Sequence, residues 1–222
     1  MKTLAKAAVA ATGIAAIAAT AQAEDRVYGP FPVTVKGYQG TAKNSVKYTG
    51  QIARQVLHDS LKKLAAKSGG ATDAALKARL TAYFAGKGGD RAIVAPVSKK
   101  GFPILQTRVG EISDTNLAGK TYGGAVPGWP NNMTGAEVVG FWIDKAAAAK
   151  GGYDLRNGYE YPQLISKFLM GAVFYNQAVD GYLDENLAAD KKPNDKPYSK
   201  GAPYTGKEHS WDEAFGYFGA PA

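Results

Sequence analysis

The stretch 162-PQLISKFLMGAVFYNQAVDGYLDENL-187 decides the fold of this 222-residue chain. Pro162 suits the first position of a helix, and apolar residues then recur every three or four positions to about Leu187. So wide an apolar arc is typical of a central helix that is buried on most sides. One stripe of this arc consists of Leu164, Phe168, Ala172, Tyr175, Val179 and Tyr182, and it is widened by Ile165, Leu169, Val173 and Leu183.

Three more segments have helical periodicity, at about 49–67, 72–85 and 134–149. Thr72 is the expected N-cap of the second, and Thr134 with Glu137 has the capping-box spacing at the start of the third. Each of the three ends near glycine, which favours helix termination. The apolar face of the first is Ala53, Val56, Leu57, Leu61 and Leu64, and that of the second is Leu76, Leu80, Tyr83 and Phe84.

The last segment, 207-KEHSWDEAFGYFG-219, predicts one short helix more. Ser210 with Glu213 has capping-box spacing, and Trp211, Phe215 and Phe218 then fall on one apolar face. Such a short helix needs a partner for its aromatic face, either in this chain or in another protein. The sequence therefore predicts an all-α fold, a bundle of about four long helices plus a short C-terminal helix.

The remaining segments lack helical periodicity. We expect an extended linker or edge strand over 24–45, a long irregular insertion over 86–132 with short strands at 93–95 and 102–106, and a solvated loop over 188–207. A structureless stretch as long as 86–132 is unusual inside a compact domain. The helical domain then covers 46–222.

Residues 1–23 have the pattern of a secretory signal peptide. Lys2 and Lys6 precede an uncharged, alanine-rich run over 7–21, and Ala21-Gln22-Ala23 fits the cleavage rule, so the mature chain is expected to begin at Glu24. The run is too short for a membrane anchor. We therefore expect a periplasmic or secreted protein with no membrane span and, because cysteine is absent, no disulfide and no N-terminal lipid.

The composition argues against nucleic-acid binding. The formal net charge is +8, but the basic residues are scattered and do not alternate with aromatic residues in a nucleic-acid pattern. Nucleophilic catalysis lacks its motifs as well, since there is no Gly-x-Ser-x-Gly elbow and no cysteine. Of the two histidines, His58 is expected on the surface of its helix. The sequence thus favours a protein that is not an enzyme.

A divalent cation site is one hypothesis for the acidic residues near the C-terminus. His209 and Asp212 lie three positions apart beside Glu208, while Asp180 and Asp184 oppose the dipole of their own helix. If antiparallel packing joins the two groups, carboxylates plus one imidazole suit iron or another borderline ion. Helix capping by Ser210 and Glu213 is the simpler explanation of the first group.

An aromatic tract also stands out, with Tyr153, Tyr159, Tyr161 and, earlier in the chain, Trp129. These rings are suited to stacking on a sugar or a haem face, although packing within the fold is the commoner use of such residues.

Several short motifs together carry a family resemblance. They are Gly135-Ala136-Glu137-Val138, Trp142-Ile143-Asp144-Lys145-Ala146, Leu169-Met170-Gly171-Ala172, Asn176-Gln177, Tyr182-Leu183, the block from His209 to Gly219, and Tyr48-Thr49-Gly50-Gln51 with Arg54. With them the chain resembles domain-of-unknown-function family 4856, which consists of exported, all-helical bacterial proteins. That family is thought to be related to imelysin-like proteins of bacterial iron uptake. Its members usually continue past the Trp-Asp-Glu block, so the resemblance implies a truncated member.

The resemblance implies a non-enzymatic periplasmic binding or accessory protein in iron acquisition. One alternative is a helical scaffold that binds a protein partner through the aromatic C-terminal face and has no small ligand. A metal-dependent enzyme is the other alternative, and the missing ligand motifs disfavour it.

Overall fold

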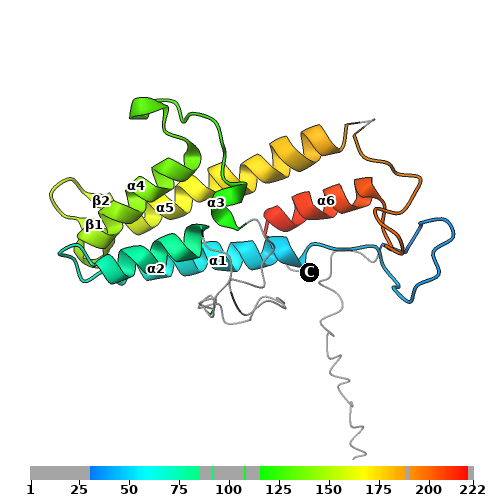
Figure 1. Ribbon diagram of the computed structural model, residues 1–222, viewed down its shortest axis with the longest axis horizontal. Helices are drawn as coiled ribbons and strands as arrows, with labels where there is room; N and C mark the ends of the chain where they lie inside the picture. Colours follow the sequence, from blue (N-terminus) through cyan, green and yellow to red (C-terminus); the bar gives the residue numbers. More distant parts are fainter. Residues whose placement is uncertain (1–30, 86–91, 93–107, 109–115, 189–190, 220–222) are drawn as a thin grey trace, which may run out of the picture.

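Helix α1 (Thr49–Ala65) and helix α5 (Tyr161–Leu169), with its continuation η5 (Met170–Asn186), run lengthwise through the molecule (Figure 1). The computed structural model describes residues 31–85, 92, 108, 116–188 and 191–219. Helices α2 (Ala74–Ala85) and α4 (Gly135–Ala148) cover α1 and α5 at one end of the elongated bundle, and α6 (Gly206–Tyr217) packs on η5 and α1 at the other end. The all-α class expected from the sequence is confirmed.

Helices α1 and α2 (Ala74–Ala85) form a helical hairpin whose facing side chains are buried. The N-cap of α2 differs from the expectation. Asp73 Oδ1 accepts a hydrogen bond from the Leu76 backbone N–H at 2.8 Å, whereas Thr72 adopts a left-handed backbone with φ of +55°. The carboxylate is the stronger acceptor for the free N–H groups of the first turn, so Asp73 caps the helix.

Helix α4 (Gly135–Ala148) begins with a complete capping box. The Thr134 N–H donates to Glu137 Oε2 at 2.7 Å, and the Glu137 N–H donates to Thr134 Oγ1 at 3.4 Å. A short turn, η4 (Lys150–Gly152), leads into the antiparallel strands β1 (Tyr153–Asp154) and β2 (Tyr159–Glu160), a small hairpin that the periodicity did not indicate.

The long fourth helix exists, but its winding changes after Leu169. In η5 the backbone hydrogen bonds are π-helical, from i to i+5, so each turn holds more residues than an α-helical turn. Val173, Phe174, Ala178 and Tyr182 are consequently its buried residues. Tyr175, which an α-helical stripe places in the core, is 65% exposed.

The region 86–132 is described only in part. Helix α3 (Leu117–Lys120) inserts Leu117 into the core, and the short turn η3 (Pro130–Asn132) precedes α4. The strands expected at 93–95 and 102–106 lie outside the described residues, as do the signal peptide and its cleavage site.

Residues 31–48 are extended, but they are not a free linker. An isolated bridge joins Pro32 to Asn44, and Val35 is buried. Thr34 Oγ1 donates to Glu208 Oε1 at 3.1 Å, which ties the segment to α6 (Gly206–Tyr217). These tertiary contacts attach the described part of the expected linker to the helical domain.

His58 is not the surface residue that the helical wheel suggested. Its Nε2 lies 3.0 Å from the Ser166 carbonyl oxygen, and its ring packs edge-on against Phe174 at 5.1 Å. Burial lowers the pKa of His58. The neighbouring helix α5 covers this position, which a wheel drawn for α1 alone does not show.

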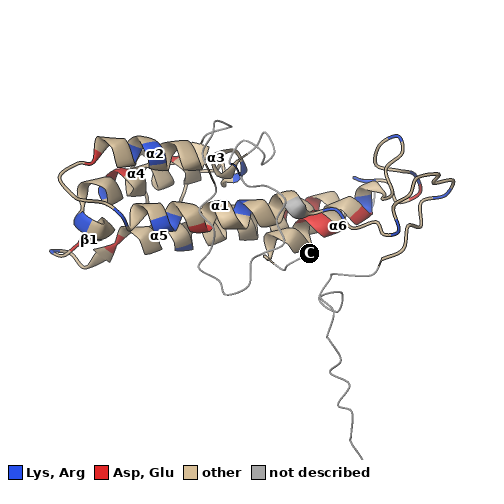
Figure 2. Ribbon diagram, turned by 90° about the horizontal axis from the view of Figure 1, so that it is seen from below, with Lys and Arg blue, Asp and Glu red and all other residues tan. Residues whose placement is uncertain are grey.

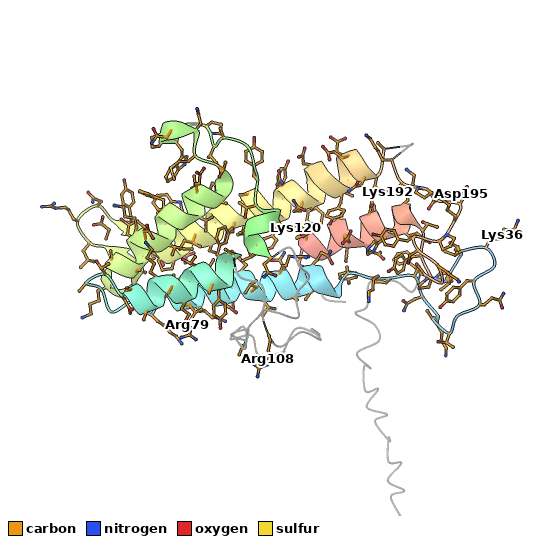
Figure 3. The ribbon with its side chains drawn as sticks, in the orientation of Figure 1. Lys36, Arg79, Arg108, Lys120, Lys192 and Asp195 are labelled. Carbon is orange, nitrogen blue, oxygen red and sulfur yellow. The ribbon has the colours of Figure 1, made fainter. Side chains whose placement is uncertain are left out.

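Charged residues of both signs are spread along the helices (Figure 2). Arg79 projects from α2, while Lys36, Lys192 and Asp195 lie on the loops around the start of α6 (Figure 3). Within the described ranges, none of the helices combines the length and the apolar character required to cross a membrane.

Candidate functional site

Helix α6 begins at Gly206, earlier than the sequence suggested. Thr205 is its N-cap: the Glu208 N–H donates to Thr205 Oγ1 at 3.2 Å, and the Thr205 N–H donates to Glu208 Oε2 at 2.7 Å. The expected cap at Ser210 with Glu213 is wrong. Two successive sequences, Thr205–Glu208 and Ser210–Glu213, have the same spacing, and the earlier one caps the helix, so Ser210 lies inside it and is buried.

The buried face of α6 is also different from the aromatic face that periodicity indicated. Trp211 is 49% exposed and Phe218 is 63% exposed, whereas Ser210, Ala214 and Gly216 are buried. Small residues allow close approach to α1: a Cβ at Gly216 would lie 2.7 Å from Gln51 Cβ. The helix therefore packs through small side chains together with one large one, Tyr217, whose ring stacks on that of Tyr182.

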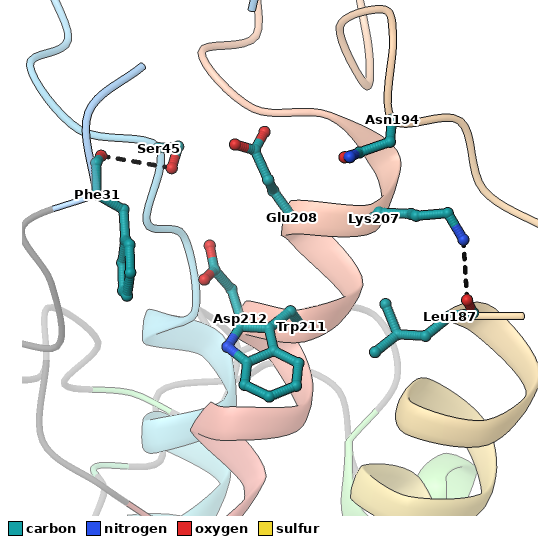
Figure 4. A pocket seen from close by; sticks show the side chains of 8 residues that line it. All are labelled: Phe31, Ser45, Leu187, Asn194, Lys207, Glu208, Trp211 and Asp212. Carbon is teal, nitrogen blue, oxygen red and sulfur yellow. Dashed lines mark hydrogen bonds between the residues drawn. The ribbon is translucent and has the colours of Figure 1, made fainter. Parts of the chain in front are cut away.

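A pocket of about 290 Å³ opens beside the first turns of α6 (Figure 4). Glu208 and Asp212, one turn apart, point to the same side of the helix, toward the segment that carries Phe31 and Ser45. Trp211 and Leu187 supply apolar surface. The complete lining is Phe31, Ser45, Leu187, Asn194, Lys207, Glu208, Trp211 and Asp212.

Asp212 is the most perturbed acid of this pocket. It is 4% exposed, and its Oδ2 accepts a hydrogen bond from the Lys47 backbone N–H at 2.9 Å. The pKa of Asp212 is raised to about 6, chiefly by burial and to a smaller extent by the nearby Glu208 and Glu213 carboxylates, while the bond from Lys47 opposes the shift. A carboxyl group perturbed in this way inside a pocket is a candidate functional group.

The lysine of the pocket is turned away from both acids. Lys207 Nζ donates to the carbonyl oxygens of Leu187 and Ala188 at 2.8 and 3.0 Å (Figure 4). Since these carbonyls hold the ammonium group, Glu208 and Asp212 keep their negative character toward the pocket.

Helix α6 lies within the part of the chain that a family model covers, whereas Phe31, Ser45 and Lys47 lie before it. The model described as domain of unknown function (DUF4856) matches residues 132–222. Residues 132–222 belong to the DUF4856 family. No curated protein and no solved structure is detectably similar to the chain. The family prediction is confirmed over this region; the Tyr48–Gln51 motif and Arg54 lie before it.

The histidine of the DUF4856 region does not line the pocket. The His209 ring contacts those of Tyr198 and Tyr204, each with its centroid 4.8 Å away, and Nε2 is 3.9 Å from Glu213 Oε2. Burial lowers the pKa of His209, and the Glu213 carboxylate opposes that shift. His209 is thus a neighbour of Glu213, and it also bonds to the backbone of Lys47, the residue whose N–H binds Asp212.

The DUF4856 region does not assemble the cation site that the sequence suggested. Asp180 and Asp184 are exposed on η5, away from the α6 pocket. Glu208 serves the cap, Asp212 binds the Lys47 backbone, and His209 does not line the pocket. Among the residues that the structure describes, no three His, Cys, Asp or Glu side chains converge as metal ligands. The predicted ligand set is wrong because η5 packs on α6 through a face that excludes its aspartates.

Glu213, expected as a capping residue, instead joins a polar network between α6 and α1. Its Oε1 accepts a hydrogen bond from Gln51 Nε2 at 2.7 Å, and the Tyr182 hydroxyl also bonds to its carboxylate. Lys120 Nζ reaches that hydroxyl at 3.4 Å. Burial raises the pKa of Tyr182, and the Glu213 charge adds to the shift. The sequence marked Gln51 only through the family resemblance, and it marked Tyr182 there and in the apolar stripe of its helix.

Proposed function

We propose that this chain is an exported, non-enzymatic binding protein whose α6 pocket takes an organic ligand with a positive charge next to an apolar body. One observation carries the proposal: Glu208 and the buried Asp212 lie one turn apart in a pocket whose only lysine among the described lining residues, Lys207, is held by backbone carbonyls. A cationic ligand would supply the missing opposite charge.

Because Asp212 is buried, a positive charge on the ligand would stabilise its carboxylate. A buried carboxylate without an opposite charge is unfavourable, which is why its pKa rises. A ligand ammonium group placed beside Asp212 and Glu208 would stabilise both carboxylates. The indole of Trp211 adds a surface on which a cation or an apolar group stacks favourably.

One feature of the pocket favours binding over catalysis. His209 is not one of the described lining residues of the pocket, so the wall of the pocket places no imidazole beside its two acids. Export to the periplasm is supported by the signal-peptide pattern of residues 1–23. An accessory role in iron acquisition follows from the resemblance alone, and within it the pocket would bind an organic partner and not a bare ion.

Calorimetric titration of the purified protein with phenethylamine tests the proposal. At pH 8 we expect phenethylamine to bind. The uncharged analogue 2-phenylethanol should bind at least about tenfold more weakly. At pH 5 Asp212 is protonated, so phenethylamine should bind more weakly. Asp212→Asn and Glu208→Gln should each weaken binding; asparagine keeps an acceptor for Lys47, and glutamine keeps the capping box.

Glu137→Gln is the matched control, because it makes the same change in the capping box of α4, outside the pocket. It should leave binding unchanged. The proposal fails if phenethylamine produces no heat, or if its affinity is the same in Asp212→Asn and Glu208→Gln as in the unaltered protein.

An interaction module is the second candidate, favoured by exposed apolar residues at the far end of α6. Met170, Tyr175 and Phe218 are 48%, 65% and 63% exposed around a hollow of about 260 Å³ that Phe174 also lines. Exposed apolar patches of this kind mark protein contacts. Light scattering at rising concentration should reveal self-association that Phe218→Ser reduces. A strict monomer throughout would argue against this candidate.

A further inference from the structure

At the end of the bundle remote from α6, a second and larger groove of about 760 Å³ lies between the loop before α4, the helix α4 and the β1–β2 hairpin. Its volume is within the range of small-molecule sites. None of its lining residues belongs to the α6 pocket. Any ligand bound there would be separate from the one proposed above.

A continuous series of aromatic rings forms the wall of this groove. Trp129 contacts Phe141 and Trp142 edge to face, with centroids 5.4 and 5.1 Å apart. The ring of Trp142 contacts that of Tyr161, with centroids 5.8 Å apart, and the ring of Tyr161 contacts that of Tyr159, with centroids 6.2 Å apart. Tyr159 is half exposed, so it offers ring surface that the core does not use.

The acid of this groove is already engaged. Asp154 Oδ1 accepts from the backbone N–H groups of Arg156 and Asn157, and Oδ2 accepts from Asn157 Nδ2 at 2.8 Å and from the Tyr161 hydroxyl at 3.2 Å. These bonds, with that from the Asn157 side chain foremost, lower the pKa of Asp154. The carboxylate therefore orients the hairpin and the Tyr161 ring.

Neutral amides supply most of the remaining polar surface. Asn131 and Asn157 line the groove together with one lysine, Lys145, whose ammonium group lies 5.2 Å from the Phe141 ring centroid. Asn157 donates Nδ2 to Asp154, which leaves its carbonyl oxygen as an acceptor. Asn131 has a left-handed backbone, with φ of +57°, in the turn η3.

We propose that this groove binds a saccharide. The C–H-bearing face of a sugar ring stacks on aromatic rings, and its hydroxyls pair with side-chain amides, which both donate and accept. A haem or another anionic planar ligand would need more cations than Lys145 supplies. A cationic ligand would need a carboxylate that is not already bonded fourfold, as Asp154 is.

The probes are maltotriose, cellotriose and chitotriose, titrated into the purified full chain while tryptophan emission and heat are recorded. We expect at least one of them to bind and to shift the emission of Trp129 and Trp142. Indole, a planar ring without hydroxyls, should bind less tightly. No binding of any of the three saccharides, or tighter binding of indole, would overturn the proposal.

Variants locate the binding. Tyr159→Ala removes a half-exposed ring and should weaken binding by at least about fivefold, the effect of losing one stacking platform. Tyr159→Phe keeps the ring and should largely preserve affinity. Asn131→Gly removes the amide at a position whose backbone conformation glycine adopts readily, so it should weaken binding without unfolding the turn.

Tyr175→Ala is the control, because it removes an exposed tyrosine of η5 that does not line the groove. It should leave saccharide affinity unchanged. Binding that persists in both Tyr159→Ala and Asn131→Gly would show that the saccharide lies elsewhere and that the groove is not its site.

Discussion

The backbone N–H of Lys47 donates to Asp212 Oδ2 at 2.9 Å, and this bond joins the segment before α1 to the last helix of the chain. It holds the segment against the first turns of α6, where Phe31 and Ser45 close one side of the pocket. Lys47 and Asp212 lie 165 positions apart in the sequence. The burial of Asp212, and with it the character of the site, depends on this long-range contact.

The first prediction concerns the pH dependence of stability. The pKa of Asp212 is about 6 in the folded protein, above its ordinary value of 3.8, so the folded state binds this proton more tightly. Its contribution to the free energy of unfolding is fully present below about pH 3.8 and is lost as the pH rises through about 6. The stability of the unaltered protein minus that of Asp212→Asn should therefore fall by up to about 3 kcal/mol between pH 4 and pH 8.

Urea unfolding at a series of pH values measures this difference. His58 and His209, whose pKa values are lowered, contribute in the opposite direction, since their stability is present above pH 6.5 and lost as the pH falls through the lowered values. Both histidines are present in both proteins, so the comparison largely removes them. Asp184→Asn controls for the loss of one negative charge at an exposed site. A difference that does not change with pH would contradict the assignment.

The second prediction concerns the cap of α6. Thr205→Ala should lower the free energy of unfolding by about 1 kcal/mol, because it removes the acceptor for the Glu208 N–H. Ser210→Ala should cause no such loss, since alanine is the better helix former inside a helix. Hydrogen exchange over 207–210 should quicken in Thr205→Ala alone. Equal effects of the two substitutions would restore Ser210 as a capping residue.

The third prediction uses two helical glycines with different surroundings. Gly216→Ala would place a Cβ 2.7 Å from Gln51 Cβ and 2.9 Å from Tyr48 Cδ2, so it should destabilise the protein by about 1–3 kcal/mol. Gly140→Ala meets no atom within 4 Å and should stabilise α4 by up to about 1 kcal/mol. Denaturant midpoints at equal m-values measure both. A neutral Gly216→Ala would show that α6 does not pack closely on α1.

The fourth prediction concerns export. The full chain expressed in a Gram-negative bacterium should be recovered from the periplasm with Glu24 as its first residue, as intact-mass measurement will show. Ala23→Tyr, which replaces the small residue at the cleavage position, should leave the chain uncut. Residues 1–23 retained in the unaltered protein would disprove the signal peptide.

Local patterns predicted the helices well because the forces that start and stop a helix act within a few residues. The α4 capping box at Thr134 and Glu137 is an example, since both partners lie in one turn. The same local rule failed at α6, where Thr205–Glu208 and Ser210–Glu213 have identical spacing. No local pattern distinguishes the two motifs. The loop geometry around Thr205 and the packing of Ser210 decide which of them caps α6.

The sequence by itself determined the helical class, the positions of α1, α2, α4 and α5, and the family of residues 132–222, because apolar periodicity and short motifs depend only on near neighbours. Only the tertiary structure decided which face of α6 is buried and which acidic residues line the same pocket. The π-helical winding of η5 rotates its side chains away from the α-helical stripe, and the segment before α1 folds back onto Asp212. Both effects arise from packing between residues far apart in the chain, which no local pattern encodes.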